Sequence, residues 1–540
     1  PSSFKTKLFE SFSKINHRGP DRSIWYEINK IFLGFHRLAI MDQSTTGDQP
    51  FIKEYNGIKT TYSITNGEIY NYKKLIEKYD IQTTSGSDCE IIIPLYEKYG
   101  IDFLVNEIDG EYCTAIIDVY HNDETIEIYL IRDSIGIRPL FYYLDENNLI
   151  FGSELKSIVE ITNNKRSILP FPPGHYLHYK ITENLTDTKL VEFTDLNFQP
   201  VFDENLAFED EYLTPIYRNI RKLLKTSVSD MLHSDRPLGA LLSGGLDSSL
   251  VVSIASKILR KQGKKLYTFS IGLPGSTDKE YAELVAKHCD TIHRHIELDN
   301  SVFLNAVDSV IWATETFDIT TIRASVGQYL ISQSISENTD IKVVLIGDGS
   351  DELTAGYIYF GLSPTAEDLH YENVRLIKEI HLYDVLRADR GIAHHGLEAR
   401  VPYLNMNFVK YYMSIDPRLR MPQNGIEKWL LRKSFSFGNY LPDQVLWRKK
   451  EAFSDGVSSL EKSWYQIIQD NVAEIHKSTD IEIEKSKYKH CPPATLEALY
   501  YRKKFEEFFG PGVDHVIPHI WMPRWCDETN DPSARTLKNY

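Results

Sequence analysis

The sequence predicts two domains of different fold class: an α+β domain, followed by an α/β domain with a doubly wound parallel sheet and a helical C-terminal part. The length of 540 residues allows two to four domains at roughly 150 residues each. Short apolar runs separated by turn residues fill 30–180, which is typical of antiparallel strands. Beyond 208 strand-length and helix-length runs alternate, which indicates a parallel sheet covered by helices.

The first domain is predicted to consist mainly of short strands around one longer helix near Glu90–Tyr99. The predicted strands are Ile31–Ile40, Thr61–Ile64, Tyr112–Val119, Glu127–Ile131, Pro139–Leu144 and Leu149–Phe151. The polar stretch 181–208 lacks long periodicity, so we expect a linker or a peripheral hairpin there. We therefore expect domains at 1–180 and 209–540.

The second domain is predicted to begin with a helix at about Pro215–Leu232. Strands are expected at Leu238–Leu242, Leu266–Ile271, His293–Leu298 and Lys342–Ile346. The helices between them are expected at Ser248–Arg260, Lys279–His288 and Val302–Ala313. The remainder, to about 525, is predicted to be mainly helical.

Charge and cysteine content limit the classes of function. The net charge of −16 argues against nonspecific nucleic-acid binding, which needs a basic surface. Five cysteines without a CxxC pair favour a reducing compartment and no structural zinc. No apolar run reaches membrane-spanning length and no signal peptide is visible, so we expect no membrane partner and a cytoplasmic location.

The strongest local signal is the segment 241–249, LLSGGLDSS, which follows a predicted strand and opens a predicted helix. A helix N-terminus at a strand end offers free N–H groups and a positive dipole end to an anion. Gly244 and Gly245 allow a close backbone approach, and Ser243, Ser248 and Ser249 add hydroxyl donors. A serine-capped Gly-Gly turn is the alternative, but the strand–loop–helix context favours a phosphate loop.

Carboxylates accompany this loop where a Walker lysine is absent. Asp247 beside a phosphate requires an intervening cation, so the sequence predicts Mg²⁺. The segment 347–352, GDGSDE, follows another strand and offers Asp351 as a second metal ligand and Asp348 as a group near the α-phosphate. An acidic helix N-terminus explains this segment equally well. Lys450, between aromatic residues, could offset charge on the phosphate oxygens.

Several separated motifs together resemble the glutamine-hydrolysing asparagine synthetase family over nearly the whole chain. In the first half they are HRGPD at 17–21, FHRLAI at 35–40, NGEIYN at 66–71, SDCE at 87–90 and RDSIGIRPL at 132–140. In the second half they are the two loops above, ETFDITTIRAS at 315–325, GLEARVPYL at 396–404 and KEAFSDG at 450–456.

The resemblance implies a class II, N-terminal-nucleophile glutaminase with an αββα sandwich, followed by an ATP pyrophosphatase of the PP-loop type. It implies that aspartate attacks the α-phosphate of ATP in the presence of Mg²⁺, giving β-aspartyl-AMP and pyrophosphate. Ammonia from glutamine then displaces AMP through an internal tunnel. The expected partners are these small molecules, and a homodimer stays open as an option.

The resemblance also implies roles for individual residues of the first domain. Arg37 matches the residue that holds the glutamine α-carboxylate, and Asp88 the partner of the α-amino group. Asn66 and Gly67 match the oxyanion hole and are counted as catalytic. The implied glutamine-binding residues are Arg37, Leu38, Ala39, Ile40, Met41, Asn66, Gly67, Glu68 and Asp88. Taken alone, Asn66-Gly67 would read as a hairpin turn.

In the second domain the resemblance implies Lys450 and Asp348 as catalytic and Asp247 and Asp351 as metal ligands. Thr320, Thr321 and Arg323 match the aspartate-binding region. The implied ATP-binding residues are Leu241, Leu242, Ser243, Gly244, Gly245, Asp247, Ser248, Ser249, Ile271, Ile346 and Gly347. Asp348 stands where several relatives have glutamate, and Ile346 where some have serine.

One departure affects the glutaminase. The family's nucleophile is a terminal cysteine whose own α-amine is the general base. Here the chain starts Pro1-Ser2-Ser3, and neither Cys89 nor Cys113 has a free α-amine. We expect the printed sequence to lack its first residues, and to make asparagine from ammonia only. Two alternatives remain: a PP-loop amide synthetase acting on another carboxylate, such as a β-lactam synthetase relative, and an inactive regulatory paralogue.

Overall fold

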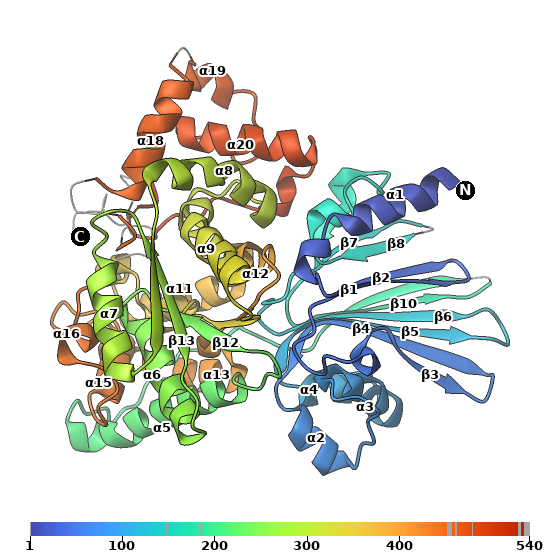
Figure 1. Cartoon of the computed structure of the whole chain (residues 1–540), viewed down its shortest axis with the longest axis horizontal. Coiled ribbons are helices and arrows are strands. Elements are labelled where there is room, and N and C mark those ends of the chain that lie inside the picture. The colour runs from blue at the N-terminus through green and yellow to red at the C-terminus, as the bar shows by residue number, and fades with distance from the viewer. Residues whose placement is uncertain are drawn as a thin grey trace. The chain divides into compact units, whose positions relative to one another are not determined.

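The computed structural model describes residues 2–146, 148–183, 185–450, 456–458, 462–477, 479–526 and 531–533. The chain forms two compact units (Figure 1). Unit 1 contains Pro1–Asp195, His233–Arg236 and Ala393–Leu397. Unit 2 contains Leu196–Leu232, Pro237–Ile392 and Glu398–Tyr540.

Unit 1 is built on antiparallel sheets. Within the described residues its largest sheet has six strands in the order β11-β10-β6-β5-β4-β3, beside sheets with the orders β1-β2 and β8-β7-β9. The strands are β1 (Arg22–Ile28), β2 (Ile31–Arg37), β3 (Phe51–Tyr55), β4 (Lys59–Ile69), β5 (Gly110–Tyr120), β6 (Ile126–Arg132), β7 (Phe141–Leu144), β8 (Leu149–Gly152), β9 (Ile168–Pro170), β10 (His175–Ile181) and β11 (Thr186–Glu192).

The six-stranded sheet of unit 1 buries both of its faces. One face packs on the helices α2 (Tyr72–Tyr79), α3 (Ile92–Tyr99) and α4 (Ile101–Glu107). The other face packs on the two smaller sheets. Successive side chains of a strand point to opposite faces, so Ile116 of β5 belongs to the first core and Ile117 to the second.

The helix α1 (Ser2–Ser13) covers β1 and β2 on the side away from the large sheet. The Phe12 ring stacks on the His36 ring of β2 with centroids 3.8 Å apart, and it also contacts Trp25 of β1. Unit 1 is therefore layered as helix, small sheets, large sheet and helices.

Unit 2 contains the parallel sheet that the sequence predicts. Its strands are β12 (Leu238–Leu241), β13 (Tyr267–Gly272), β14 (Ile292–Glu297), β15 (Val343–Leu345) and β16 (Glu398–Arg400). They are all parallel, in the order β14-β13-β12-β15-β16. All three β15 residues are buried, because both faces of such a sheet are covered by helices.

The strand order fixes where ligands would bind. The chain proceeds outward from β12 to β14 and then returns to add β15 on the other side of β12. Crossover connections are right-handed, so this reversal places the helices on opposite faces of the sheet. The carboxyl ends of β12 and β15 then flank the crevice at which open α/β sheets bind their ligands.

The helices of unit 2 account for most of its described residues. They are α5 (Asp210–Asp230), α6 (Leu246–Lys261), α7 (Asp278–Cys289), α8 (Asn300–Thr314), α9 (Ile319–Asn338), α10 (Ser350–Thr354), α11 (Ala366–Glu379), α12 (Asp384–Ala393), α13 (Met406–Ser414), α14 (Pro417–Arg420), α15 (Trp429–Phe435), α16 (Asp443–Leu446), α18 (Trp464–Ile475), α19 (Ile481–Lys485) and α20 (Leu496–Phe509). Within the described ranges none of the helices has the length and apolar character needed to cross a bilayer.

Most predicted elements are found, with boundaries shifted by a few residues. The stretch 181–208 contains the edge strand β11, whose residues are mostly exposed. The sequence did not indicate β16, because two of its three residues are charged. Arg400 of this strand is nevertheless fully buried, with its guanidinium bonded to Glu398 and to the Met231 carbonyl.

Candidate active site

The segment Ser243–Gly245 forms a tight loop between β12 and α6 in unit 2. Gly244 has φ of +78°, and a Cβ atom there would lie 2.5 Å from the Cβ atom of Tyr281 on α7. Only glycine fits this position. The loop therefore turns sharply, and the N-terminal turn of α6, which carries Asp247, follows at the carboxyl end of β12.

The loop after β15 lies directly against the first one. A Cβ atom on Gly347 would lie 2.7 Å from the backbone nitrogen of Ser248, so no side chain fits between the loops. The Ser350 hydroxyl, on the first residue of α10, donates to Asp247 Oδ1 at 2.7 Å. The two strand ends therefore bring their acidic segments together.

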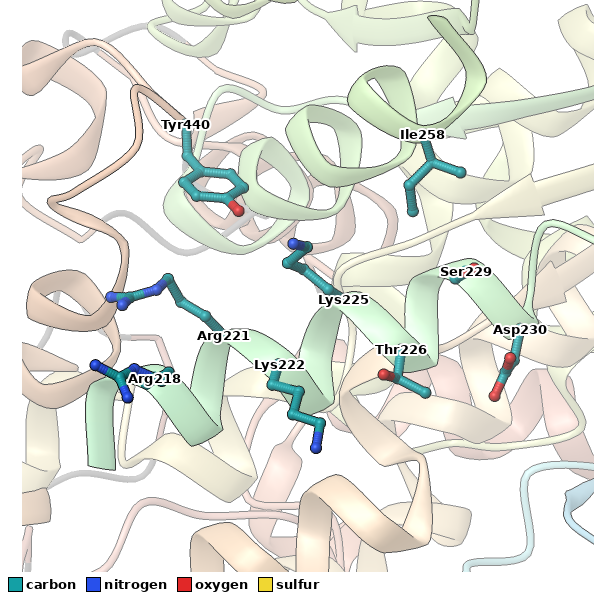
Figure 2. Close-up of a pocket in the computed structure, with 9 residues that line it drawn as sticks. All are labelled: Arg218, Arg221, Lys222, Lys225, Thr226, Ser229, Asp230, Ile258 and Tyr440. Atoms are coloured by element: carbon teal, nitrogen blue, oxygen red, sulfur yellow. The ribbon is translucent and has the colours of Figure 1, made fainter. Parts of the chain in front are cut away.

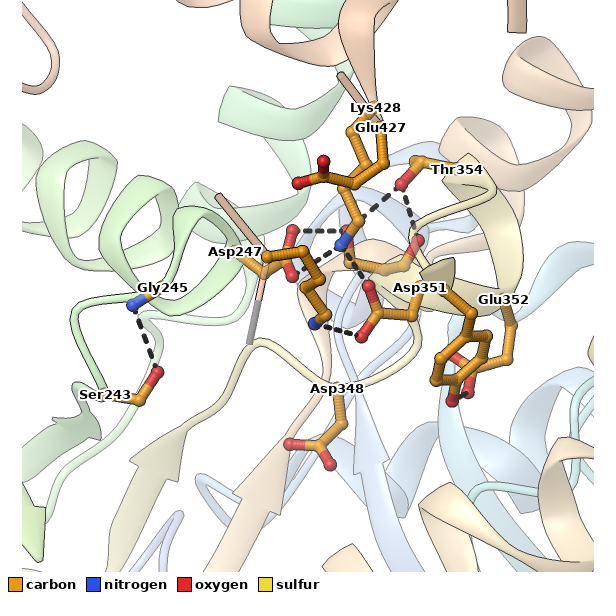
Figure 3. A network of polar contacts seen from close by, with 12 residues as sticks. Ser243, Gly245, Asp247, Asp348, Asp351, Glu352, Thr354, Glu427 and Lys428 are labelled. Atoms are coloured by element: carbon orange, nitrogen blue, oxygen red, sulfur yellow. Dashed lines mark hydrogen bonds and ion pairs between the residues drawn. The ribbon is translucent and has the colours of Figure 1, made fainter. Parts of the chain in front are cut away.

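A buried lysine joins the two carboxylates. Lys428 Nζ lies 2.5 Å from Asp247 Oδ2 and 2.5 Å from Asp351 Oδ1. Lys450 Nζ donates to the other carboxylate oxygen of Asp351 at 2.6 Å. Figure 3 shows the Lys428 ammonium between the two aspartates. Two negative and two positive charges thus balance in a site that is largely removed from water.

The pKa values of this cluster reflect that balance. Burial opposes ionisation of Asp351, but Lys428 and Lys450 outweigh it and hold the pKa of this carboxyl well below its ordinary value. Burial likewise opposes the charge on Lys450, and Asp351 and Asp247 raise its pKa above the ordinary lysine value. Asp351 and Lys450 are therefore both charged at neutral pH.

Asp348 belongs to a separate polar network. Its carboxylate accepts a hydrogen bond from Arg387 Nη1 at 2.6 Å and one from Gln328 Nε2 at 3.2 Å. Burial raises the pKa of Asp348, Arg387 opposes that shift, and Asp384 adds to it. Figure 3 shows Asp348 directed away from the Lys428 ammonium. Its partners come from α9 and α12.

Apolar residues line the ends of the three adjacent strands. Leu242, Ile271 and Ile346 are buried at the carboxyl ends of β12, β13 and β15, and Leu241 is partly exposed. The loop serines bond mainly to each other, with the Ser243 and Ser248 hydroxyls 3.1 Å apart. The structure therefore brings the sequence-predicted nucleotide residues to one edge of the sheet.

The three residues predicted to bind aspartate lie at the start of α9, in different surroundings. Thr321 donates its hydroxyl to the helix-capping Asp318 at 2.7 Å. Arg323 is buried, and its guanidinium forms paired bonds with Glu497 and with Asp531. The Thr320 hydroxyl is buried, and it neither donates nor accepts a hydrogen bond within the described residues. Thr320 is the one of the three whose polar atom is not already used.

In unit 1 the residue Arg37 organises a loop. It ends β2, is buried, and bonds to the Ser44 carbonyl and to Asp48 Oδ1, both at 2.6 Å. Its other terminal nitrogen bonds to the carbonyls of Met41 and Asp42. These four acceptors all belong to residues of the segment 41–48, so the guanidinium holds this segment in place. Leu38, Ala39 and Ile40 lead into it from β2.

The other predicted glutamine-binding residues of unit 1 meet around β4. Asn66, Gly67 and Glu68 lie on β4, and Asp88 begins the short 3₁₀ helix Asp88–Ile91. Asp88 accepts a hydrogen bond from the Ile69 backbone at 2.6 Å. A Cβ atom on Gly67 would lie 1.9 Å from the Glu111 carbonyl oxygen, so glycine is required there. The Asn66 side-chain nitrogen is buried and donates no hydrogen bond within the described part of the chain.

The segment 41–48 is also joined to these residues. Gln49 exchanges hydrogen bonds with the backbone of Thr65, which precedes Asn66. Asp42 accepts from the Gly86 backbone at 2.9 Å, two residues before Asp88. Burial opposes ionisation of Asp42, but hydrogen bonds from Ser44, Gly86 and Thr46 hold its pKa well below the ordinary value. The two halves of the predicted glutamine site are therefore adjacent.

Sequence reasoning missed the residues that complete the site in unit 2, namely Ser350, Lys428, Gln328 and Arg387. The signal for Lys428 is weak: a lysine between a glycine turn at 425 and an apolar helix. Gly356 gives a second signal, because a Cβ atom there would lie 1.9 Å from Lys428 Cε and 2.0 Å from Asp351 Oδ1. Of the KEAFSDG motif, residues 451–455 lie outside the described residues.

The donor set at Asp247 and Asp351 suits Mg²⁺. The two carboxylates lie on either side of the Lys428 ammonium, and Mg²⁺ commonly takes one or two carboxylates plus phosphate oxygens. Within the described residues no group of three or more potential ligands lies together. Phosphate oxygens would supply the remaining metal ligands, so Mg²⁺ would need no protein ligand beyond these two carboxylates.

Two family models match the chain. The model described as asparagine synthase matches residues 219–370 and 361–516. The model described as a glutamine amidotransferase domain matches residues 2–193. The boundary between the two matches falls near the boundary between unit 1 and unit 2.

Curated relatives match over nearly the full length. Asparagine synthetase [glutamine-hydrolyzing] of Gallus gallus is 42% identical, covering 98% of this chain and 96% of that protein. The enzyme of the same name from Homo sapiens is 40% identical with the same coverage. A probable asparagine synthetase [glutamine-hydrolyzing] of Acanthamoeba polyphaga mimivirus is 42% identical, covering 97% and 95%. On this evidence, the chain belongs to the asparagine synthase family.

Proposed function

We propose that this chain synthesises asparagine from aspartate, using ATP to activate the side-chain carboxylate and the amide nitrogen of glutamine as the donor. The observation that carries the proposal is the meeting of Asp247, Asp351, Lys428 and Lys450 at adjacent ends of parallel strands. Family membership supports the reaction, and the paired charges beside the loop Ser243–Gly245 support binding of a triphosphate there.

In the first step an oxygen of the aspartate side chain attacks the α-phosphorus of ATP. The bond from that phosphorus to the pyrophosphate oxygen breaks, giving β-aspartyl-AMP. The N–H groups of the loop Ser243–Gly245 and of the first turn of α6 would hold the phosphates. Mg²⁺ held by Asp247 and Asp351 would neutralise charge on the departing pyrophosphate. Lys450 and Lys428, which contact these carboxylates, would add positive charge beside the phosphates.

The acceptor carboxylate would approach from the side of α9. Thr320 and Thr321 would contact aspartate; the Thr320 hydroxyl is buried and has no hydrogen bond within the described residues. Arg323 would contribute its positive charge while paired with Glu497 and Asp531. Asp348, oriented by Gln328 and Arg387, would hold the amino or ribose groups near the α-phosphate. Leu241, Leu242, Ile271, Ile346 and Gly347 would form the walls of the adenosine site.

In the second step ammonia attacks the acyl carbon and AMP leaves. We propose that unit 1 supplies this ammonia as an N-terminal-nucleophile glutaminase of the αββα type. Asn66 and the Gly67 N–H would form the oxyanion hole, and Asp88 and Glu68 would bind the α-amino end of glutamine. The segment 41–48, fixed by Arg37, would close over the glutamine carboxylate.

The proposed domain assignment follows from these roles. The glutaminase domain would occupy 1–180, a connecting segment 181–208, and the synthetase domain 209–540. The cytoplasmic location and the homodimer remain predictions of the sequence.

The test is a pyrophosphate-release assay on the full chain with ATP, Mg²⁺ and ammonium chloride, with and without aspartate. Pyrophosphate and asparagine are expected in equal amounts, and only with aspartate. In a parallel series on the full chain, glutamine replaces ammonium chloride. Asparagine formed in that series would show that unit 1 supplies ammonia.

The same assay separates the alternatives. An inactive regulatory paralogue would release no pyrophosphate with any substrate. An amide synthetase for another carboxylate would release none with aspartate, but would respond in a screen of other amino and carboxylic acids. Either outcome would overturn the proposal.

A further inference from the structure

A row of positive side chains lies on α5, away from the candidate active site. Arg218, Arg221, Lys222 and Lys225 are spaced i, i+3, i+4 and i+7, so they share one side of the helix. Within the described residues none of the four forms an ion pair, although the chain as a whole has a net charge of −16. The bond that Arg221 makes is to a neutral acceptor, the carbonyl of Ser434. This row carries positive charge that the described chain does not neutralise.

The row lines a pocket of about 530 Å³. The opposite wall is formed by Ile258 of α6 and by Tyr440, and Thr226 and Ser229 of α5 add hydroxyl groups (Figure 2). Among these lining residues the only carboxylate is Asp230, at the far end of the row. The pocket thus combines cations, hydroxyl donors and one aromatic ring.

A fifth cation lies beside the pocket. Lys257 of α6 donates to the carbonyls of Gly438 and Asn439, at 2.7 and 2.8 Å, and its Nζ lies 3.9 Å from the centre of the Tyr440 ring. Burial lowers the pKa of Lys257, Cys289 opposes that shift, and the positive charges of Arg260 and Lys225 add to it. The positive groups on both sides of the pocket are therefore close enough to repel each other.

Like charges held together favour an anion between them. Each charge acts over about 8 Å at physiological ionic strength, so a small ligand in the pocket would experience the local cations more than the negative remainder of the chain. A long polyanion would extend over that remainder and be repelled. A cavity of this size is in the range of small-molecule sites.

We propose that this pocket binds a soluble small molecule carrying two or more phosphate groups. Lysine and arginine at helical spacing would contact successive phosphates, and the Tyr440 ring and Ile258 would pack on the remaining part of the ligand. The pocket is separate from the phosphate loop, since Ile258 lies twelve residues, ~18 Å along the helix axis, from the start of α6 at Leu246.

The test measures binding of inorganic tripolyphosphate to the full chain by isothermal titration calorimetry. Wild-type protein is expected to show two classes of site, one at the candidate active site and one at the pocket. The double variant K222Q/K225Q should weaken the pocket class by about tenfold or more, and leave the other class unchanged. Thermal melting establishes that the variant is folded.

The matched control is K261Q/K264Q, which removes the same charge from two exposed lysines outside the pocket. It should retain both classes. Equal tripolyphosphate binding by wild type and K222Q/K225Q would overturn the proposal, as would a wild type whose single class of site is unchanged in K222Q/K225Q. Binding of a short single-stranded RNA or of phosphoinositide vesicles, tighter than tripolyphosphate and lost in the same variant, would overturn the soluble small-molecule class. Because the active-site class is measured in the same titration, failure of the proposed enzymatic function is distinguished from failure of this site.

Discussion

The two candidate sites are assembled in different ways. In unit 2 the charged groups come from four places in the sequence, at 247, 351, 428 and 450, and meet only because the parallel sheet is formed. In unit 1 one arginine holds a segment that begins four residues after it. The first site therefore depends on the whole unit, whereas the 41–48 part of the second depends on one nearby arginine. Substitutions should reveal that difference.

The largest effect is expected from Lys428→Ala. Removing this ammonium leaves Asp247 and Asp351 facing each other with one lysine instead of two, and breaking a buried ion pair typically costs about 3 kcal/mol or more. Aspartate-dependent pyrophosphate release should fall by about a thousandfold. The control is Lys433→Ala on α15, the helix that Lys428 immediately precedes; the Lys433 nitrogen lies 3.8 Å from Asp210 at the surface. A Lys428→Ala variant with more than a tenth of wild-type activity would show that the cluster is not part of the reaction.

A smaller loss is expected from Gly356→Ala. The new methyl group would collide with Lys428 Cε and Asp351 Oδ1 and push both from their positions. Displacement by about 1 Å can reduce a rate by about a hundredfold. Gly391→Ala on α12 is the matched control, since nothing lies within 4 Å of a Cβ atom there. Equal rates for the two variants would contradict this geometry.

Asp348→Asn should have a more moderate effect. The amide keeps the size of the side chain and its contact with Gln328, but it loses the charge that pairs with Arg387. We expect pyrophosphate release to decrease by about tenfold. The control is Asp340→Asn, an exposed residue just before β15, the strand that Asp348 follows. If Asp348→Asn retains the wild-type rate, Asp348 has no part in the mechanism.

The local character of the unit 1 site is tested by Arg37→Lys. A lysine cannot reach the four oxygen acceptors that the guanidinium bonds, so the segment 41–48 should open more often. Amide hydrogen exchange in Met41–Asp48 should be about tenfold faster, and unchanged in the sheet. Arg22→Lys removes the other, more exposed arginine on Asp48 and should have little effect. Faster exchange throughout unit 1 would contradict a local role.

The smallest effect concerns pH. The pKa of Asp42 is depressed in the folded chain, so this residue stabilises the fold above its unfolded value of about 4, and the contribution is lost as pH falls through the folded pKa. The difference in melting temperature between wild type and Asp42→Asn should be constant from pH 7 to about pH 5. It should narrow as pH falls from about 4 to 2. The exposed Asp187→Asn serves as the control, and a gap that widens in acid would contradict the assigned cause.

The parts of the fold that the sequence predicted are those with strong local signals. The phosphate loop was recognised because Gly244 and Gly245 stand between an apolar strand and a helix; the contact with α7 requires glycine at 244. The strands β12 and β15 were recognised because they are short runs of apolar residues. Such features depend on residues that are neighbours in the sequence.

The parts that were missed lack a local signal, and some depend on residues far apart in the sequence. Lys428 is 181 residues from Asp247, and no local pattern distinguishes it from a surface lysine. The strand β11 is mostly exposed and polar, so it lacks the alternation that indicates a strand. Arg37 was assigned to a ligand carboxylate, whereas its geometry shows bonds to the protein's own carbonyls and to Asp48; whether it also binds glutamine stays a prediction.

The composition of unit 1 has a practical consequence for dissecting this protein. Two short pieces from later in the chain, His233–Arg236 and Ala393–Leu397, belong to it. Asp235 accepts a bond from the Asp42 backbone, and Gly396 lies against Pro20. A recombinant fragment ending at Asp195 would lack both pieces, so expressing each half from its own gene would not reproduce either unit. Separating the two activities calls for point substitutions rather than truncation.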